Sequence, residues 1–589
     1  MAETRGKTPQ RGRWPVVAVH SCVAGTVLVL VAVLALVVKP PAPPGIAAFA
    51  PQAAKPITKA PQNQSAQFGT GQGQCAHGQV CQGGSPTPKP GGSASPSASP
   101  KPLTGAAPPG LQCYTWPDGT ITQTFDPQSP PCISRWDDSK GNGGSTSPGV
   151  SATEIRVAFG INSKASLATW PALKPLVDFF NTHFQLYGRQ IKIVPFASQQ
   201  ADGQFDGTKV NDPALQRADA AEIANRKVFA TFDFLDNVPY SWALPNYRDY
   251  LTKHKIVSIS GGASPPYGTE QDLAAHTPYE WSYYPTIDTL MKNVATMTCR
   301  QLVGKPAKHA QDPALAAKTR KFALVFPTDA LLGGPVPGLS SMLSILDGCG
   351  VHSPEVIRYD AGDDNTVVPM LEKFRQLKNE GITSLIFFPH VGSAARGAPQ
   401  TLADRVQYSP EWITIGWNKY LTDIWSGSPQ KQKAATFGVA LWNKQPQLAL
   451  ENWYQAYAVA GGTSTGAATL NDGLAFYNEI LLLASGIQMA GPHLTPESFA
   501  EGLCSTTFPN PGAAAAPFFQ GTVGFGPGDA AMVNDFSEFW FDPSTDWQSY
   551  QGQPGLNFYR TDCYVGLGRR WWLDTWPTTD LFYRDTACR

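Results

Sequence analysis

The sequence predicts an α/β protein of two consecutive lobes, each with a parallel β-sheet flanked by helices. From residue 149 onward, short apolar runs alternate with helical stretches of about 10–15 residues, a pattern typical of βαβ units and a parallel sheet. The same alternation begins again after residue 285. The stretch at 384–389 (SLIFFP) is almost wholly apolar, as expected of a strand buried on both faces.

The first lobe opens with a strand at 155–159, in which Ile155, Val157 and Phe159 alternate with other residues and share one face. Further strands are expected at 190–197, 228–234 and 256–260, and helices at 171–184, 213–225 and 247–254.

The second lobe repeats the pattern with strands at 322–326, 355–359, 384–389, 412–416 and 437–441, and helices at 287–303, 338–347 and 367–379. Two helices at 448–460 and 474–489 follow, and a closing strand is expected at 536–541. A further helix should begin at Thr495-Pro496-Glu497, because Thr is a good N-cap and Pro suits the first helical position.

The N-terminus predicts a membrane anchor at 15–38, since 24 mostly apolar residues can cross a hydrocarbon core of about 30 Å. Four basic residues precede it: Arg5, Lys7, Arg11 and Arg13. Basic flanks stay inside, so 1–14 should be a cytoplasmic tail and the rest of the chain extracytoplasmic, in a single-pass protein of the cell membrane. The alternative is a signal peptide cleaved near Ala50, after which the protein would be secreted.

Residues 39–110 are rich in Pro, Gly and Ser and predict a disordered, semi-extended linker, because they cannot bury enough apolar surface to offset the entropy of ordering. The stretch 111–148 predicts a small disulfide-closed element followed by a Gly/Ser hinge.

Nine of the ten cysteines follow the anchor, which favours an oxidising compartment. No CxxC occurs and no His stands at zinc-ligand spacing, so no metal site is expected. Plausible local disulfides are Cys75–Cys81, Cys113–Cys132, Cys299–Cys349 and Cys563–Cys588. These pairings are hypotheses, since a sequence does not fix connectivity. An odd number leaves one thiol free, and Cys504 is the candidate.

Composition argues against nucleic-acid binding, because the formal net charge is zero and only 15% of residues are charged. Catalysis is not expected either. The stretch 462–466 (GTSTG) fits the G-x-S-x-G pattern, but that nucleophile needs a strand before the Ser, and here a helix is predicted. GFGPGD at 524–529 predicts a turn, and no other motif indicates a cofactor.

An ordered series of segments resembles the type I periplasmic binding proteins, and within them the branched-chain amino-acid and amide-type solute-binding proteins of ABC importers. The series begins with GVSATEIRVAFG, DPALQRADAAEIANRKVFATFDF and KIVSISGGASPP. It continues with KFALVFPTDALLGG, ITSLIFFPH and EWITIGW, and ends with the late GTVGFGPGD. The resemblance covers 149–545.

The resemblance implies two hinged lobes, lobe 1 at 149–285 plus 442–530 and lobe 2 at 286–441 plus 531–545, with a Cys-containing extension at 546–589 beyond it. The ligand would lie in the cleft between the lobes, at the carboxyl ends of the strands, and the lobes would close around it. The expected function is that of a membrane-tethered protein that captures a small-molecule solute for ABC permease subunits. The alternative is a surface sensor or protein-interaction module that uses the same fold without transport.

The resemblance also implies ligand contacts in the GGASPP turn, at Ser260, Gly261, Ala263 and Ser264. Other strand-end loops add Asn162, Ser163, Phe234, Asp236, Thr328, Asp329, His390, Trp417 and Asn418. Asn418 stands where the amino-acid binders of the family usually place an acidic residue, and Leu332 where an aromatic is usual. A neutral or larger solute, held by Trp417 and other aromatic side chains, therefore fits these positions at least as well as an amino acid or amide.

Overall fold

The computed structural model describes 113–161, 170–197, 213–232, 245–260, 269–328, 336–359, 367–389, 398–416, 428–441, 448–464, 467–512, 515, 520–525, 529–547, 561–566 and 570–584. All of these residues belong to one compact unit, 71–589. The predicted tail, anchor and linker lie outside them. In the part of the chain that the structure describes, no helix is both long and apolar enough to cross a membrane.

The first sheet has five parallel strands in the order β4-β3-β5-β6-β7. Their bounds are β3 Glu154–Ile161, β4 Gln190–Ala197, β5 Ala230–Phe232, β6 Val257–Ser260 and β7 Glu280–Ser282. The four strands predicted for this lobe are confirmed, and β7 is an addition.

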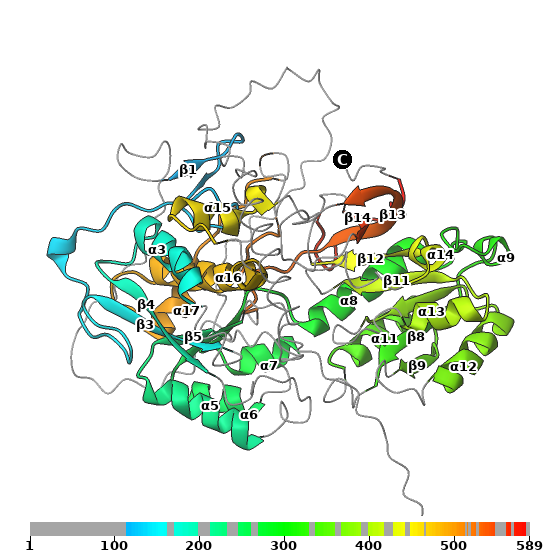
Figure 1. Ribbon diagram of the computed structural model, residues 1–589, viewed down its shortest axis with the longest axis horizontal. Coiled ribbons are helices and arrows are strands. Elements are labelled where there is room, and N and C mark those ends of the chain that lie inside the picture. The colour runs from blue at the N-terminus through cyan, green and yellow to red at the C-terminus, as the bar shows by residue number, and fades with distance from the viewer. Residues whose placement is uncertain are drawn as a thin grey trace, which may run out of the picture. The chain divides into compact units, whose positions relative to one another are not determined.

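Helices cover both faces of this sheet (Figure 1). Successive side chains of β3 point to opposite faces, so the strand contributes apolar side chains to a core on each side. Ile155, Val157 and Phe159 pack with α3 (Lys174–His183) and α16 (Ala467–Ala490). Ala158, on the opposite face, packs with α5 (Pro213–Asn225) and α6 (Pro245–Lys253). The apolar face predicted for β3, formed by Ile155, Val157 and Phe159, therefore packs into the larger of the two cores.

The second sheet has the order β14-β13-β12-β11-β10-β8-β9. Its bounds are β8 Phe322–Pro327, β9 Val356–Tyr359, β10 Ser384–Phe387, β11 Glu411–Gly416, β12 Thr436–Ala440, β13 Ser537–Trp547 and β14 Thr561–Gly566. Strands β8 to β12 are parallel to one another, whereas β13 pairs antiparallel with β12, and β14 pairs antiparallel with β13. On β8, Leu324 and Phe326 lie in one buried cluster, and Ala323 and Val325 lie in another, so this sheet too is buried on both faces.

The helices of the second lobe are α8 Ile287–Met297, α9 Pro313–Ala316, α11 Leu339–Gly348, α12 Val367–Glu380, α13 Ala398–Arg405 and α14 Gln430–Lys433. Those of the first lobe also include α7 Glu270–Ala275, α15 Asn452–Val459 and α17 Pro496–Ser505. A π-helix at Thr298–Leu302 extends α8, so the predicted helix at 287–303 is confirmed. The start predicted for α17 is confirmed as well, since the Thr495 hydroxyl accepts a hydrogen bond from the Ser498 N–H (3.1 Å).

The chain passes between the two sheets three times, through crossing segments that we define as 283–286, 441–451 and 520–536. Residues 442–447 of the second crossing and 526–528 of the third lie outside the described residues. The first and third crossings run side by side: the Met532 N–H donates to Ser282 O (2.7 Å) and the Val533 N–H to Tyr283 O (3.2 Å). Two α/β lobes joined by crossing segments are the architecture expected from the sequence, which did not indicate how many crossings there are.

Two of the predicted disulfides are confirmed, Cys113–Cys132 and Cys299–Cys349. The prediction that Cys504 is free is wrong, because this residue is disulfide-bonded. Local spacing was the only guide to pairing, and Cys504 lies far in sequence from every other cysteine. It is also 1% exposed, so it is joined within a packed part of α17. The predicted pairs Cys75–Cys81 and Cys563–Cys588 lie outside the described side chains.

The C-terminal segment 570–584 packs against the second lobe. The Trp576 indole N–H donates to Asn293 Oδ1 on α8 (2.8 Å), and the ring of Phe582 lies 4.5 Å from that of Phe437 on β12. Trp576 and Phe582 are both almost fully buried. This segment, for which the sequence suggested no role, therefore completes the hydrophobic core of the lobe. The predicted domain bounds stay predictions.

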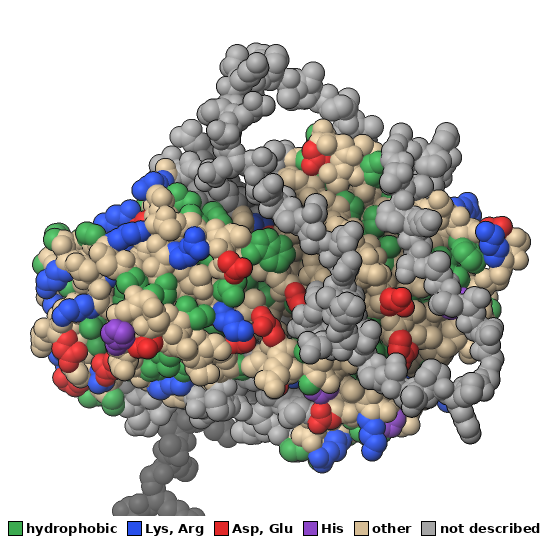
Figure 2. All heavy atoms as spheres, turned by 180° about the vertical axis from the view of Figure 1, so that it is seen from behind, with side chains coloured by type: hydrophobic (Ala, Val, Ile, Leu, Met, Phe, Trp, Pro, Cys, Tyr) green, Lys and Arg blue, Asp and Glu red, His purple; other side chains and the backbone are tan. Residues whose placement is uncertain are grey.

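Acidic and basic side chains occur together over the face drawn in Figure 2, as the zero net charge leads one to expect. Within the described ranges, the exposed large apolar side chains are Tyr114, Val368 and Val459. They lie on three different elements, and single exposed apolar residues of this kind are ordinary on a protein surface.

Candidate functional site

The strand order places the candidate site at the carboxyl edges of the two sheets. In the first sheet β3 lies between β4 and β5, and in the second β8 lies between β9 and β10. The chain therefore leaves each central strand toward one side and later returns on the other. At such a topological switch point the loops separate and leave a crevice outside the carboxyl ends of the strands, where open α/β sheets bind their ligands.

Two of the predicted site residues lie in the described part of the chain, and both stand at these edges. Ser260 ends β6, is 8% exposed and accepts the Tyr283 N–H through its carbonyl (2.7 Å). Thr328 directly follows β8, is half-buried and donates its N–H to Tyr359 O (2.8 Å). The other eleven predicted residues lie outside the described residues: Asn162, Ser163, Phe234, Asp236, Gly261, Ala263, Ser264, Asp329, His390, Trp417 and Asn418.

A cluster of aromatic rings stands at the first switch point, and sequence reasoning missed it. The ring of Phe159, near the end of β3, lies 4.8 Å from Phe476 on α16 and 6.1 Å from Trp170. Phe232, the last residue of β5, lies 6.4 Å from Phe159. Trp170 is half-buried in a short 3-10 helix, Trp170–Leu173. No motif marks this tryptophan, and only the fold brings it to the edge.

Two buried tyrosines begin the first crossing beside Ser260. The Tyr284 hydroxyl accepts a hydrogen bond from Asn478 Nδ2 (2.9 Å), and the Tyr283 hydroxyl donates to Gln128 Oε1. Burial, together with nearby negative charge, raises the pKa of both phenols well above the usual value. Both are therefore neutral at physiological pH and act here as fixed, uncharged dipoles.

Charged groups connect the lobes close to the same edge. Glu270, in the first turn of α7, accepts hydrogen bonds from Lys292 Nζ (3.1 Å) and from the Thr289 hydroxyl, both on α8. Asp529, in the late GFGPGD stretch, accepts the Ala531 N–H (3.0 Å). Burial, with a further contribution from the charge of Glu270, raises the pKa of Asp529 to about 7. This carboxyl group is therefore partly protonated near neutral pH.

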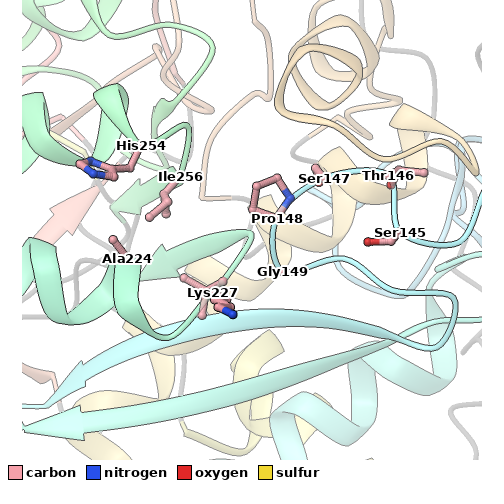
Figure 3. Close-up of a pocket in the computed structure, with 10 residues that line it drawn as sticks. Ser145, Thr146, Ser147, Pro148, Gly149, Ala224, Lys227, His254 and Ile256 are labelled. Atoms are coloured by element: carbon pink, nitrogen blue, oxygen red, sulfur yellow. The ribbon is translucent and has the colours of Figure 1, made fainter.

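A pocket of about 370 Å³ lies at the opposite edge of the first sheet (Figure 3). It is lined by Ser145, Thr146, Ser147, Pro148, Gly149, Ala224, Lys227, Val228, His254 and Ile256. Its hydroxyls are used internally, since Ser145 donates to Val150 O (3.0 Å) and Thr146 to Leu494 O (2.6 Å). Neither Ser260 nor Thr328 lines this pocket, so it is separate from the switch point.

Two kinds of catalytic centre can be checked in the described residues: a metal-binding group and the predicted G-x-S-x-G stretch at 462–466. The described residues hold no group of three or more His, Cys, Asp or Glu side chains placed to bind a metal ion. The helix predicted before GTSTG is confirmed as α15, and the Ser464 N–H donates to the Tyr457 hydroxyl (3.1 Å). The strand that must precede a hydrolase nucleophile is therefore absent before Ser464.

No protein-family model matches the chain, and no curated protein matches it. Solved structures do. A substrate-binding protein of an ABC transporter from Desulfitobacterium hafniense, in complex with Leu, is 13% identical and has a TM-score of 0.43, over 66% of this chain and 98% of that chain. A solute-binding protein from R. palustris in complex with 4-hydroxybenzoate is also 13% identical, with a TM-score of 0.44, over 71% and 97%.

A periplasmic binding protein from Burkholderia mallei is 12% identical, with a TM-score of 0.46, over 74% of this chain and 99% of that chain. The five parallel strands of each sheet share one order and are flanked by helices, and three crossings join the two sheets. Solved structures that this chain resembles include substrate-binding and solute-binding proteins of ABC transporters and a periplasmic binding protein.

Proposed function

We propose that this chain is an extracytoplasmic solute-binding protein that captures a small polar or amphipathic solute between two lobes and delivers it to an ABC importer. One observation carries the proposal: the five parallel strands of each sheet have the same order, each sheet has a switch point, and three crossings join the two sheets. In this proposal 15–38 tethers the protein to the cell membrane, and the linker at 39–110 holds the lobes away from it.

Capture would need no covalent chemistry. Backbone N–H groups and hydroxyls at the strand ends, among them Ser260 and Thr328, would donate to the polar groups of the solute. The closed arrangement of the lobes would be populated because the solute contacts both of them only there, and a ligand shifts an equilibrium by its differential affinity for the two states.

One aromatic side chain at the switch point of the first lobe favours an amphipathic solute. Phe159 and Phe476 are buried, whereas Trp170, which packs against them, is half-buried and presents apolar surface there. At the position where amino-acid binders usually carry an acid, this chain has Asn418. Burying an ammonium without a negative partner is costly, so a solute with an apolar or aromatic body and neutral or anionic polar groups fits better than a simple zwitterion.

Thermal unfolding of the full chain in detergent tests the proposal, against panels of amino acids, amides, sugars, nucleosides and aromatic acids. A solute at one hundred times its dissociation constant should stabilise the chain by about 2.7 kcal/mol, which raises the melting temperature by a few degrees. Ser260→Ala and Thr328→Val should reduce the shift. Ser258→Ala, in the same strand but away from its carboxyl end, is the matched control and should retain it.

The panel also separates the proposal from its alternative. A shift with one chemical class, reduced by Ser260→Ala but not by Ser258→Ala, supports a solute-binding protein of that class. No shift across the whole panel, with a folded protein, contradicts it and favours a surface sensor or a module that binds a protein or a polymer.

A further inference from the structure

Two segments outside the resemblance to binding proteins, 113–136 and 570–584, both contact the crossing segments. In the N-terminal segment, Gln128 is 3% exposed. Its side-chain carbonyl accepts the hydroxyl of Tyr283, in the first crossing. Its amide nitrogen donates to Gly521 O (2.9 Å), in the third crossing. One side chain of the disulfide-closed element thus joins two of the three crossings.

Asp126 fixes the loop that carries Gln128. Its Oδ1 accepts the Gln128 N–H (2.8 Å), and its Oδ2 accepts the hydroxyl of Tyr477 on α16 (2.7 Å). The side chain of Asn452, directly after the second crossing, also hydrogen-bonds to Asp126. The loop is therefore held by the helix that covers the first sheet and by the end of the second crossing.

Arg570 contacts the crossings from the C-terminal segment. Its Nε donates to Asp535 Oδ1 (2.9 Å) and its Nη2 to Asp535 O (2.6 Å), both in the third crossing. The same Nη2 donates to Leu441 O (2.8 Å), at the start of the second crossing. The side chains of Arg570 and Asp535 are 4% and 2% exposed, so these bonds form away from water.

The two sets of contacts meet in the third crossing. Both carboxylate oxygens of Asp535 accept the Thr522 N–H (3.1 Å each), and Thr522 follows Gly521, the acceptor of Gln128. A Cβ at Gly521 would lie 2.3 Å from Val533 Cγ1 and 3.1 Å from Arg570 Nη2, and the residue has φ +140°. Glycine is therefore needed here because Val533 and Arg570 lie close to the backbone that accepts the hydrogen bond from Gln128.

We propose that Gln128 and Arg570 form a hinge brace: two positioning residues that restrain the crossing segments and so set how readily the lobes open for a solute. Opening requires dihedral changes in the crossings, and each buried donor or acceptor left unpaired there opposes the motion. The inference rests on the lobe movement of the proposed function. Both residues act on the lobes through the backbone of the crossings and through Tyr283.

Hydrogen–deuterium exchange of the full chain without solute tests the brace. Four amides report on the crossings: Ser282 donates to Ala530 O, Tyr283 to Ser260 O, Met532 to Ser282 O and Val533 to Tyr283 O. In Gln128→Leu and in Arg570→Lys, these amides should exchange at least tenfold faster. Amides within β3 and β8 should keep their wild-type rates, because the brace does not contact those strands.

Two matched controls lose comparable hydrogen bonds away from the crossings. Arg189 is 3% exposed, and its guanidinium donates to backbone carbonyls, among them Ser151 O and Pro492 O (2.8 Å each). Gln432 is fully buried; it donates to Tyr408 O (2.9 Å) and accepts the Trp412 indole N–H (2.8 Å). Arg189→Lys and Gln432→Leu should lower the melting temperature without selectively accelerating the four amides.

Wild-type exchange at the four amides in folded Gln128→Leu and Arg570→Lys would overturn the brace, and so would equal acceleration in the controls. If Gln128→Leu does not fold, Gln128→Glu replaces it, because this variant still accepts from Tyr283 but no longer donates to Gly521 O. The readout needs no solute. Faster exchange therefore supports the brace even if the solute panel gives no shift, and unchanged exchange overturns the brace even if a solute is found.

Discussion

Two buried aspartates, Asp126 and Asp580, and the half-buried Asp529 have pKa values that their surroundings move in different directions. Burial raises the pKa of Asp126 to about 6 and that of Asp529 to about 7. Burial would also raise the pKa of Asp580, but the hydrogen bond from His309 and the charges of His309 and Lys308 outweigh it and bring the value to about 2. The sign of each shift depends on whether a cation lies beside the carboxylate.

Asp126→Asn should reduce the pH dependence of stability between pH 4.5 and 7.5. Because the folded pKa of Asp126 lies above its unfolded value of 3.8, its contribution is fully present below pH 3.8 and is lost as the pH rises through about 6. The wild-type chain should lose about 2 kcal/mol from this residue across that window. Urea unfolding of both proteins at the two pH values measures the difference.

Asp529→Asn is the comparison for this prediction. Asp529 also lowers the free energy of unfolding as the pH rises, up to about pH 7. Asp529→Asn should therefore remove the contribution of Asp529 to the pH dependence of stability and leave the contribution of Asp126 unchanged. An Asp126→Asn protein with the full wild-type slope would show that Asp126 titrates at its unfolded value and that the prediction is wrong.

Asp580→Asn should destabilise the chain by about 3 kcal/mol at pH 7, because it removes the carboxylate that faces the buried guanidinium of Arg320 (3.6 Å) and the ring of His309. His309 Nε2 lies 3.0 Å from Asp580 Oδ2, and the two side chains are 8% and 6% exposed. With a folded pKa of about 2, the contribution is present above pH 3.8 and lost as the pH falls toward 2, so the two proteins should converge in acid. Denaturant unfolding at pH 7 and pH 3 measures this.

An exposed pair of the same chemistry is the control. His352 Nδ1 lies 2.8 Å from Asp347 Oδ1, but these side chains are 73% and 65% exposed. Exposed ion pairs contribute about 0–1 kcal/mol, so Asp347→Asn should change stability little. Equal losses in Asp347→Asn and Asp580→Asn would contradict the role given to burial.

At the scale of elements, the sequence predicted the long and regular parts of the fold best. β4 and α5 have the bounds expected from their patterns, 190–197 and 213–225. β7 and α7 were not predicted, because three and six residues are too few to show a period. β7 is held instead by tertiary bonds, among them the Ser282 N–H to Ala530 O (3.0 Å).

The candidate site, like the fold, has a part that the sequence predicts and a part that it does not. Its place at the carboxyl edges could be predicted, since the order of strands and helices fixes where parallel strands end. The aromatic cluster around Trp170 could not, because Phe159, Phe232 and Phe476 come from segments far apart in sequence. The Cys504 bond was missed for the same reason, since local spacing says nothing of partners brought together by packing.

Gly149→Ala tests how the N-terminal element enters the first sheet. Gly149 has φ +77°, and a Cβ there would lie 2.1 Å from the backbone nitrogen of Phe229, just before β5. Backbone cannot give way as a flexible side chain does, so a loss of at least 3 kcal/mol is expected in urea unfolding, beyond the cost of about 1 kcal/mol for the left-handed conformation alone.

Gly144→Ala separates these two costs. Gly144 has φ +66°, but nothing lies within 4 Å of its Cβ position, so its variant should lose about 1 kcal/mol. Equal losses of unfolding free energy in the two variants would mean that the contact with Phe229 contributes nothing and that the backbone conformation alone determines the cost.

At the scale of the whole molecule, the segments at the two ends of the described chain both contact the crossing segments. The N-terminal element contacts the crossings through Gln128 and the C-terminal segment through Arg570, although they are more than four hundred residues apart. The proposed linker, 39–110, precedes the N-terminal element directly and connects it to the proposed tether. A protein built in this way would join its membrane attachment to its hinge rather than to one lobe, so a change at the crossings would be transmitted to the C-terminal end of the linker.

The Cys113–Cys132 disulfide gives the last prediction. It closes a stretch of 19 residues that contains Asp126 and Gln128, so Cys113→Ser/Cys132→Ser should lower the free energy of unfolding of the whole chain by about 3 kcal/mol. Calorimetry of the full chain should show the main transition at lower temperature, and exchange at Tyr283 and Val533 should accelerate because the brace is loosened. Cys299→Ser/Cys349→Ser, which opens a stretch of 50 residues in the second lobe, should cost about 4 kcal/mol yet leave those amides protected in the folded protein. If the first pair instead produced only a separate low-temperature transition, with the crossings unchanged, the N-terminal element would be an independent appendage and not a part of the hinge.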